Sequence, residues 1–276
     1  MKKRRYHDAA PEAGRASRRY HDRVAGVYDE SYRTPWWEHH DRLVWEFIKP
    51  LLPPDRPARA LDLGCGTGKW GLKLAKSGFA VTFVDNSVKM LDQARARAAE
   101  LNLKNCEFLA ADICALPDLP AASFHFATAL GDPFCLCADA RAAARELARL
   151  LAPGGGAAVS FDHRHGALEH FLEKGGLEEL ERFLRDGKTR WLTERSEEQF
   201  PVTMFTAEEV ARLWAEAGLE MRDLVGLTVL PARKYPQLLA DPEQGRHLLA
   251  LEQRHWRTRE LWSRATHLLA AVRRRP

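Results

Sequence analysis

The residues best suited to chemistry lie in one glycine-rich stretch, Asp62-Leu63-Gly64-Cys65-Gly66-Thr67-Gly68. An apolar run precedes it and a run with helical spacing follows it, so it is predicted to form the turn between a strand and a helix. Glycine lets the backbone approach a ligand closely, and the N–H groups at the start of the next helix point toward that ligand. The stretch therefore predicts a ligand-binding loop.

Two cofactor patterns fit this loop. Gly66, Gly68 and Gly71 have the G-x-G-x-x-G spacing of dinucleotide-binding folds, and Asp85 stands about twenty residues further on, where a ribose-binding acid belongs. Asp62 separates the two patterns, because a carboxylate just before the glycines suits a ligand with an ammonium group and repels a pyrophosphate. The loop therefore favours S-adenosylmethionine over NAD.

The elements that must position this loop alternate between strands and helices. Short apolar runs are separated by amphipathic helical runs, which is typical of a parallel sheet with helices on both faces. Strands are predicted at 60–63, 81–84, 107–110, 124–129, 157–161, 220–230 and 267–272. The expected fold is therefore α/β, with a doubly wound, mostly parallel sheet of seven strands.

The helix ends are also visible in the sequence. Ser87 is a predicted N-cap for a helix over 88–101, and Asp139 is one for a helix that runs to residue 151. Thr206 and Glu209 have the spacing of a capping box that opens a helix to residue 217. Two further helices are expected between residues 20 and 53.

We expect one domain, over residues 20–276, after a basic tail at 1–19. The strand and helix period lapses at 163–205, which we interpret as a lid insertion, and 231–264 is expected to be a helical excursion before the last strand. Regularity returns after each insertion, so neither is expected to form a domain of its own.

Further motifs follow the loop in a fixed order. They are Thr82-Phe83-Val84-Asp85, Ala110-Ala111-Asp112-Ile113, Ala129-Leu130-Gly131 and Leu151-Ala152-Pro153-Gly154-Gly155. From about residue 28 onward the sequence resembles the class I, Rossmann-like, S-adenosylmethionine-dependent methyltransferases of the small-molecule type. The resemblance implies a Rossmann-like methyltransferase fold whose last strand is antiparallel, with S-adenosyl-L-methionine as cofactor and S-adenosyl-L-homocysteine as product.

The resemblance also implies how the cofactor is bound. The loop glycines are expected to surround the methionine part, Asp85 to accept the ribose hydroxyls, and Asp112 to accept the adenine amino group, since carboxylates only accept hydrogen bonds. Tyr28 belongs to a Tyr-Asp element in which an N-terminal helix closes over the cofactor. The expected cofactor-binding residues are Tyr28, Asp62, Gly64, Cys65, Gly66, Gly68, Asp85, Asn86, Met90, Asp112, Ile113 and Leu130.

An ordinary structural role stays open for several of these residues. Asp85 and Asp112 also suit strand-end or capping positions. Met90 has the spacing of a helix residue that packs in the core. Tyr28 and Tyr32 stand four residues apart, so on one helix face they would simply pack against the domain.

Catalysis of methyl transfer requires positioning above all. Holding donor and nucleophile in line provides on the order of 7–11 kcal/mol, whereas a general base adds roughly 3–5 kcal/mol. Candidate bases are Asp132 after the fourth strand and His163 after the fifth, and a mechanism without a base stays open. The Asn-Pro-Pro-Tyr or Asp-Pro-Pro-Tyr signature of enzymes that methylate base or amide nitrogen is absent after the fourth strand.

A small-molecule acceptor is expected, because a lid as long as 163–205 suits a substrate that must be enclosed. Aromatic and imidazole groups available to line such a pocket are Trp36, Trp37, His39, His40, Trp191, Phe200 and Phe205. Two alternatives stay open: an RNA or protein acceptor bound by the basic ends of the chain, and a non-catalytic or NAD-binding relative. The sequence indicates no particular oligomeric state.

The composition is that of an ordinary globular protein. The 276 residues are 45% apolar and 29% charged, with a formal net charge of +4. No stretch approaches the roughly 18 apolar residues that a membrane span needs, and the basic start Met1-Lys2-Lys3-Arg4-Arg5 lacks the apolar core of a signal peptide. A cytoplasmic location is expected. The five cysteines form no Cys-x-x-Cys pair, so reduced thiols and no metal site are expected.

Overall fold

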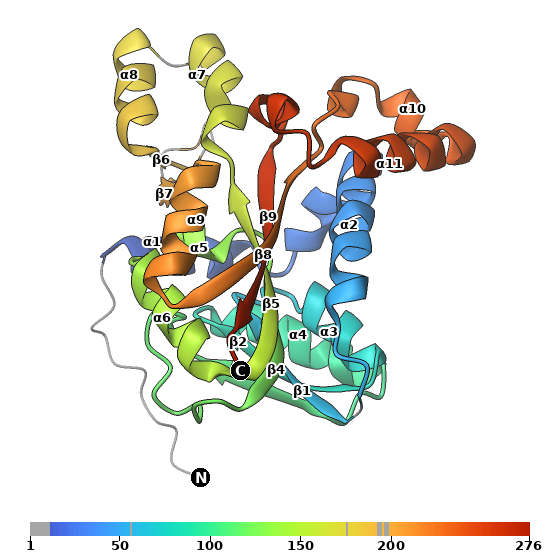
Figure 1. Ribbon diagram of the computed structural model, residues 1–276, viewed down its shortest axis with the longest axis vertical. Coiled ribbons are helices and arrows are strands. Elements are labelled where there is room, and N and C mark those ends of the chain that lie inside the picture. The colour runs from blue at the N-terminus through green and yellow to red at the C-terminus, as the bar shows by residue number, and fades with distance from the viewer. Residues whose placement is uncertain (1–11, 56, 175, 192–194, 196–198) are drawn as a thin grey trace.

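One seven-stranded sheet organises the computed structural model, which describes residues 12–55, 57–174, 176–191, 195 and 199–276 (Figure 1). The strand order is β3-β2-β1-β4-β5-β9-β8. All neighbours pair in parallel except β9, which is antiparallel to both β5 and β8. The strands are β1 (Ala58–Leu63), β2 (Phe79–Asp85), β3 (Cys106–Ala110), β4 (Phe124–Ala129), β5 (Leu151–Asp162), β8 (Leu219–Leu227) and β9 (His267–Arg274). This arrangement confirms the doubly wound sheet and its antiparallel last strand.

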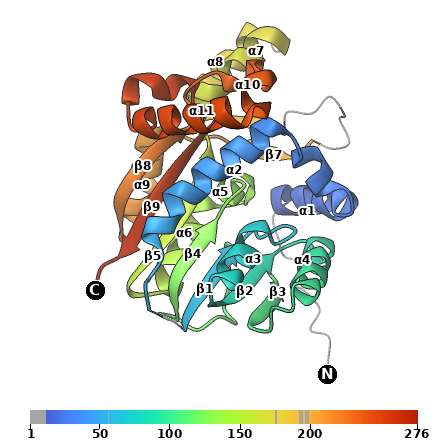
Figure 2. The ribbon, with the colours of Figure 1, turned by 90° about the vertical axis from the view of Figure 1, so that its right-hand side faces the viewer.

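Helices cover both faces of the sheet (Figure 2). One core cluster joins the sheet to α2 (Pro35–Ile48), α3 (Lys69–Lys76), α4 (Val88–Glu100) and α11 (Pro242–His255). The other joins it to α5 (Pro133–Leu136), α6 (Ala140–Leu150) and α9 (Ala207–Glu216). The remaining helices are α1 (Glu12–Val24), η1 (Tyr28–Tyr32), η2 (Lys49–Leu51), η3 (Arg164–Ala167), α7 (Leu168–Lys174), α8 (Leu177–Asp186), η5 (Ala232–Lys234), α10 (Pro236–Ala240) and η6 (Arg259–Arg264).

The predicted helix caps are present. The Ser87 side chain accepts from the N–H of Met90 at the start of α4. Asp139 accepts two backbone N–H groups at the start of α6, and Thr206 and Glu209 form the reciprocal capping box of α9. These caps satisfy N–H groups that a helix leaves without internal partners, which explains why a local sequence signal located the helix starts correctly.

Several boundaries differ from the predictions. Strand β5 begins at Leu151, six residues earlier than expected, and it includes the Pro153-Gly154-Gly155 turn motif. The helical excursion expected over 231–264 consists of separate short elements, of which α11 ends at His255 and η6 begins at Arg259. Helix α1 begins at Glu12, inside the stretch expected to be a tail, because its apolar face packs on the domain. The basic residues at 2–5 lie outside the described residues.

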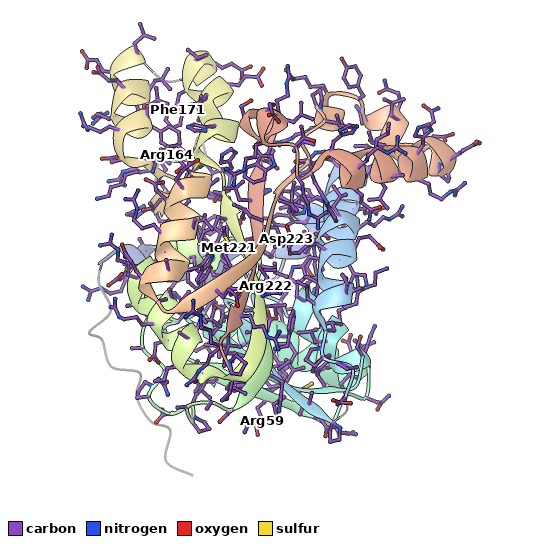
Figure 3. All side chains as sticks on the ribbon, in the orientation of Figure 1. Arg59, Arg164, Phe171, Met221, Arg222 and Asp223 are labelled. Atoms are coloured by element: carbon purple, nitrogen blue, oxygen red, sulfur yellow. The ribbon has the colours of Figure 1, made fainter. Side chains whose placement is uncertain are left out.

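The lid contains a small hairpin that the sequence pattern did not predict. Its strands, β6 (Lys188–Arg190) and β7 (Pro201–Thr203), have three residues each, too few for a period to be detected. The lid is fixed at its base by Arg164, which is 5% exposed and donates to both carboxylate oxygens of Glu209 on α9. Figure 3 places Arg164 below Phe171 of α7, between the lid and the sheet. The lid is therefore tied to the sheet through α9.

Close packing of α3 on the sheet yields a prediction for Gly71. A Cβ on Gly71 would lie 2.2 Å from the Phe83 ring and 2.8 Å from Oδ2 of Asp62. We expect Gly71→Ala to lower the free energy of unfolding by about 1–3 kcal/mol, because the extra carbon overpacks the core. Urea unfolding followed by tryptophan fluorescence measures this. Gly26→Ala is the matched control, since a Cβ there meets no atom within 4 Å; equal effects of the two variants would contradict the packing argument.

Candidate active site

The glycine loop, residues 64–68, joins β1 to α3 at the carboxyl end of the parallel strands. Gly64, Gly66 and Gly68 have φ values of 64°, 52° and 88°, a left-handed conformation that glycine adopts without strain. The N–H of Cys65 donates to the carbonyl oxygen of Val84 over 3.0 Å and ties the loop to the sheet. A Cβ on Gly66 would meet no atom within 4 Å although Gly66 lines a cavity. The backbone of Gly66 is therefore exposed to any ligand in that cavity.

Asp85, at the end of β2, holds the loop from the next strand. Its Oδ2 accepts the Gly66 N–H and its Oδ1 accepts the Ser87 N–H, both at 2.8 Å. Its side chain is buried, and this burial raises the pKa of the carboxyl above its ordinary value. Each oxygen keeps a further lone pair for a hydroxyl donor. Asp112, after β3, accepts from the N–H of Cys114 over 2.9 Å and also lines the cavity.

Asp62 is placed differently from its predicted neighbours. It is 2% exposed, its Oδ2 accepts the Gly71 N–H of α3, and its Oδ1 accepts the Thr128 hydroxyl of β4, both at 2.8 Å. Burial raises the pKa of this carboxyl to about 7. Asp62 does not line the cavity. Its contact in this structure is with the elements that shape the glycine loop, and its expected contact with a cofactor ammonium group stays a prediction.

The N-terminal segments α1 and η1 lie over the glycine loop, and we call them the roof. Asp29 of η1 accepts the Thr67 hydroxyl at 2.7 Å and pairs with Arg97 of α4. Asp22 of α1 accepts the Ser87 hydroxyl at 2.6 Å. The roof continues into the lid, because the ring of Tyr20 lies 5.3 Å from that of Phe200 and 6.2 Å from that of Trp191. Residues before β1 therefore contact both the glycine loop and the lid.

A continuous cavity of about 630 Å³ lies beneath this roof. Most of the predicted site residues line it: Tyr28, Gly64, Cys65, Gly66, Asp85, Asn86, Asp112, Ile113, Leu130, Asp132 and His163. Asp62, Gly68 and Met90 do not, and Met90 is fully buried on α4. Of the aromatic and imidazole side chains expected in the acceptor pocket, Trp36, Trp37, His40, Trp191 and Phe200 line the cavity, whereas His39 and Phe205 do not.

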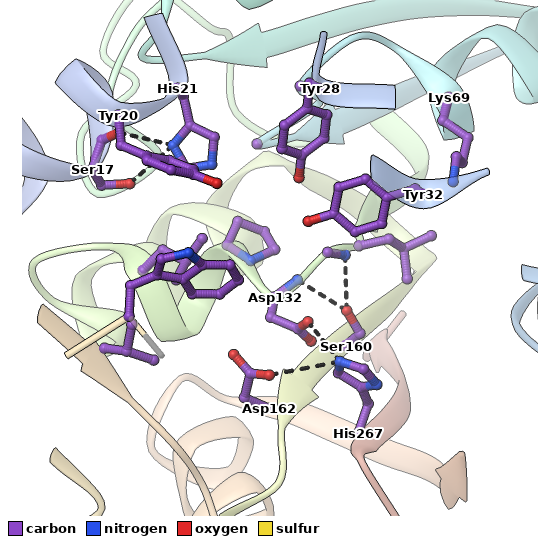
Figure 4. A pocket seen from close by; sticks show the side chains of 18 of the residues that line it. Ser17, Tyr20, His21, Tyr28, Tyr32, Lys69, Asp132, Ser160, Asp162 and His267 are labelled. Atoms are coloured by element: carbon purple, nitrogen blue, oxygen red, sulfur yellow. Dashed lines mark hydrogen bonds and ion pairs between the residues drawn. The ribbon is translucent and has the colours of Figure 1, made fainter. Parts of the chain in front are cut away.

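The far end of the cavity carries a polar cluster (Figure 4). Oδ2 of Asp132 lies 3.4 Å from Nε2 of His267, and Oδ1 of Asp162 lies 3.6 Å from the same nitrogen. Burial raises the pKa of both carboxyl groups to about 7, and the charge of Asp132 adds to the effect on Asp162. Burial also lowers the pKa of His267, which Asp162 partly opposes. Asp132 and His267 are buried and Asp162 is half-buried, and all three line the cavity together with Leu130 and Gly131.

Asp162 and His267 are functional candidates that the sequence prediction did not select. Asp162 ends β5 next to His163, the residue that was chosen. His267 opens β9, and because β9 is antiparallel its first residue pairs with the last residue of β5. The signal available in the sequence was a polar residue at the end of an otherwise apolar strand, which holds for both Asp162 and His267. The partner strand of β9 could not be known from the sequence.

The segment that carries these features matches a known family. Residues 60–155 match a model of the methyltransferase domain, and they contain the glycine loop, Asp85, Asp112 and Asp132. This segment is a methyltransferase domain, and a solved S-adenosylmethionine-dependent methyltransferase from Mesorhizobium loti shares the fold of the chain, with a TM-score of 0.58 at 21% identity over 84% of this chain and 98% of that one. The resemblance drawn from the ordered motifs is confirmed, and S-adenosylmethionine, rather than NAD, is the cofactor of this family.

Known methyltransferases are similar to this chain over different extents. It is 26% identical over 168 residues to tRNA 5-carboxymethoxyuridine methyltransferase of Escherichia coli K12, which covers 59% of this chain and 63% of that enzyme. It is 27% identical over 240 residues to the ubiquinone biosynthesis O-methyltransferase of Alkalilimnicola ehrlichii, which covers 84% and 92%. The chain thus spans less than two thirds of the first relative.

A solved structure matches almost the whole length of this chain. The [4+2]-cyclase SpnF superposes with a TM-score of 0.64 at 21% identity, over 99% of this chain and 99% of that one. At this level of identity the likeness shows a shared fold alone. None of the helices in the described part of the chain is both long and apolar enough to cross a membrane.

The burial of Asp62 in this methyltransferase domain predicts a pH effect on stability. Its pKa is about 7 when folded and about 3.9 in an unfolded chain, so between these values the folded state binds more protons and loses stability as pH rises. Asp62→Asn cannot titrate, yet its amide oxygen still accepts the Gly71 N–H. The variant should therefore lose less unfolding free energy than the wild type between about pH 5 and about pH 8.

Urea unfolding at the two pH values measures the difference for Asp62→Asn. All other buried carboxyl groups are common to both proteins, so they cancel in the comparison. Asp92→Asn, on the exposed face of α4, is the control and should follow the wild type. Parallel pH curves for wild type and Asp62→Asn would contradict the raised pKa.

Proposed function

We propose that this chain transfers the methyl group of S-adenosylmethionine to a small molecule enclosed in the cavity. The observation that carries the proposal is the continuity of that cavity. Its lining includes the glycine loop and Asp85 together with Asp132 and aromatic side chains of the lid. At about 630 Å³ it lies within the usual range of small-ligand sites, roughly 300–1,000 Å³.

The wall of the cavity fits the cofactor in one specific respect. Gly66 and Gly131 both line it with positive φ, and a Cβ on either would meet no atom within 4 Å. A side chain at either position would occupy the cavity itself. The glycine loop would hold the methionine part, Asp85 the ribose hydroxyls and Asp112 the adenine amino group. When bound, the cofactor supplies an electrophilic methyl group on a positively charged sulfur.

The residues of the chain contribute positioning and exclusion of water. Side chains of the roof and the lid line the cavity, and the turn at Gly131 and Asp132 is held by the Ser160 hydroxyl, which accepts both N–H groups at 3.1 and 3.2 Å. Fixing donor and acceptor in line accounts for on the order of 7–11 kcal/mol. Asp132 and His163 both line the cavity, and their role as catalytic residues remains a proposal.

The segments that line the cavity favour a small acceptor over a macromolecule. Side chains of α1, η1, α2 and the β6–β7 hairpin all line it, so an acceptor must fit beneath four separate segments. The ubiquinone biosynthesis O-methyltransferase, which is aligned over most of both chains, supports the same choice. The tRNA methyltransferase supports the alternative, in which arginines of α1 would contact RNA phosphates.

The proposed ribose contact predicts that Asp85→Ala weakens the binding of S-adenosylhomocysteine at least tenfold. The substitution removes the acceptors for the hydroxyls and releases the N–H of Gly66. Isothermal titration calorimetry measures the affinity, and circular dichroism checks the fold. Asp92→Ala is the control, because its exposed carboxylate pairs only with Arg95 among the described residues. Unchanged affinity in folded Asp85→Ala would place the ribose elsewhere.

The proposed acceptor class predicts where a labelled methyl group goes. The chain is incubated with methyl-tritiated S-adenosylmethionine and either a dialysable metabolite extract or total tRNA. We expect label in dialysable products, because a cavity of about 630 Å³ has the size of a small-ligand site. Label confined to tRNA, with a rate that falls steeply with salt, would contradict the small-molecule assignment and favour the RNA alternative.

A further inference from the structure

Three side chains from distant parts of the sequence point toward one another at the acceptor end of the cavity (Figure 4). Asp132 follows β4, Asp162 ends β5, and His267 begins β9. One ligand atom from each lies within 4.8 Å of the other two. In the described part of the chain, the nitrogen of a basic side chain that lies within 4.0 Å of the carboxylates of Asp132 and Asp162 is Nε2 of His267.

The distances within this cluster do not suit direct hydrogen bonds. Charged hydrogen bonds between nitrogen and oxygen span about 2.7–2.9 Å, whereas Nε2 of His267 lies 3.4 and 3.6 Å from the two carboxylates. Ligand atoms that share a cation at about 2.0–2.2 Å are separated by about 3.0–3.5 Å. In addition, Oδ1 of Asp132 is buried without a hydrogen-bond partner among the described residues, on a side chain 7% exposed.

The orientation of His267 is set by a chain of hydroxyl groups. Thr228 donates to the Leu227 carbonyl oxygen at 2.6 Å, so the Thr266 hydroxyl must donate to Thr228 at 2.7 Å. The Thr266 oxygen then accepts from Nδ1 of His267 at 2.9 Å. Because Nδ1 carries the proton, the neutral ring directs the Nε2 lone pair at both carboxylates. Metal-binding histidines commonly have such a partner for the second nitrogen.

We propose that Asp132, Asp162 and His267 bind one divalent transition-metal ion at the acceptor end of the cavity. Two carboxylates and one imidazole suit first-row ions such as Mn²⁺ and Zn²⁺ better than Mg²⁺, which prefers oxygen ligands alone. Three protein ligands leave positions open toward the cavity, as in catalytic metal sites. The ligand set contains no cysteine, which explains why the cysteine pattern did not indicate it.

The chemical role of the ion rests on the proposed methyl transfer. The binding of the ion to these three residues does not depend on that proposal. A divalent cation here would hold an oxygen atom of the acceptor and lower the pKa of an acceptor hydroxyl. The favoured acceptor is then a hydroxyl compound with a second oxygen close enough to chelate the same ion. Methylation at oxygen would follow: the hydroxyl proton would pass to water, the oxygen would bond to the methyl carbon, and the carbon–sulfur bond would break to leave S-adenosylhomocysteine.

Metal binding is tested on the full chain after dialysis against a chelator. Titration calorimetry with Mn²⁺ and with Zn²⁺ should show one saturable site, with weaker binding of Mg²⁺, and electron paramagnetic resonance should report bound Mn²⁺. Asp162→Asn and His267→Gln should each weaken binding at least tenfold. Thr266→Val should weaken it about 10–100-fold by releasing Nδ1, and Thr266→Ser should retain the affinity.

His247→Gln is the matched control, because His247 is exposed on α11 and lies outside the cavity lining. Thermal melting checks that each variant is folded. Absence of a saturable site in the wild type, or equal affinity in the wild type and a folded Asp162→Asn, would overturn the proposal. Binding of S-adenosylhomocysteine to the same variants separates the two proposals. We expect these variants to bind it as tightly as the wild type does. A wild type that binds the metal ion but not S-adenosylhomocysteine would contradict the proposed methyl transfer and leave the metal site standing.

Discussion

The carboxylate of Asp62 is the contact on which the geometry of the site depends. It lies in β1 and accepts hydrogen bonds from α3 and from β4, so it joins the three elements that meet at the glycine loop. A buried carboxylate without such partners would be costly, and the two bonds fix its position. Gly64 in turn packs against Pro133, close enough that a Cβ would lie 2.5 Å from it. The loop after β1 and the turn after β4 are therefore positioned relative to each other.

This coupling explains how one cavity serves two purposes. The proposed cofactor half is built by loops that follow β1, β2 and β3, and the proposed acceptor half by residues that follow β4 and β5. Because neighbouring parallel strands end at the same edge of the sheet, both halves share one wall. The roof, formed by α1 and η1, contacts the glycine loop through Asp29 and the lid through Tyr20.

The sequence allowed prediction of those features that depend on local chemistry. The caps at Ser87, Asp139 and Thr206 each satisfy nearby N–H groups, so a few residues sufficed to locate them. The seven strands were visible as apolar runs, and the order of motifs placed Asp85 and Asp112 at the cavity. Long-range features were not visible. The packing of α1, the β6–β7 hairpin and the meeting of Asp162 with His267 all depend on segments far apart in the chain.

The antiparallel strand also governs how the molecule is assembled. In the sheet, β8 has β9 as its one neighbour, although β9 follows β8 along the chain and lies between it and β5. During synthesis β8 therefore has no position in the sheet until residues 267–274 have left the ribosome. Until then the backbone edge that β5 presents to β9 lacks its hydrogen-bonding partner. Nascent chains that stop short of β9 would consequently offer an open strand edge for association with one another.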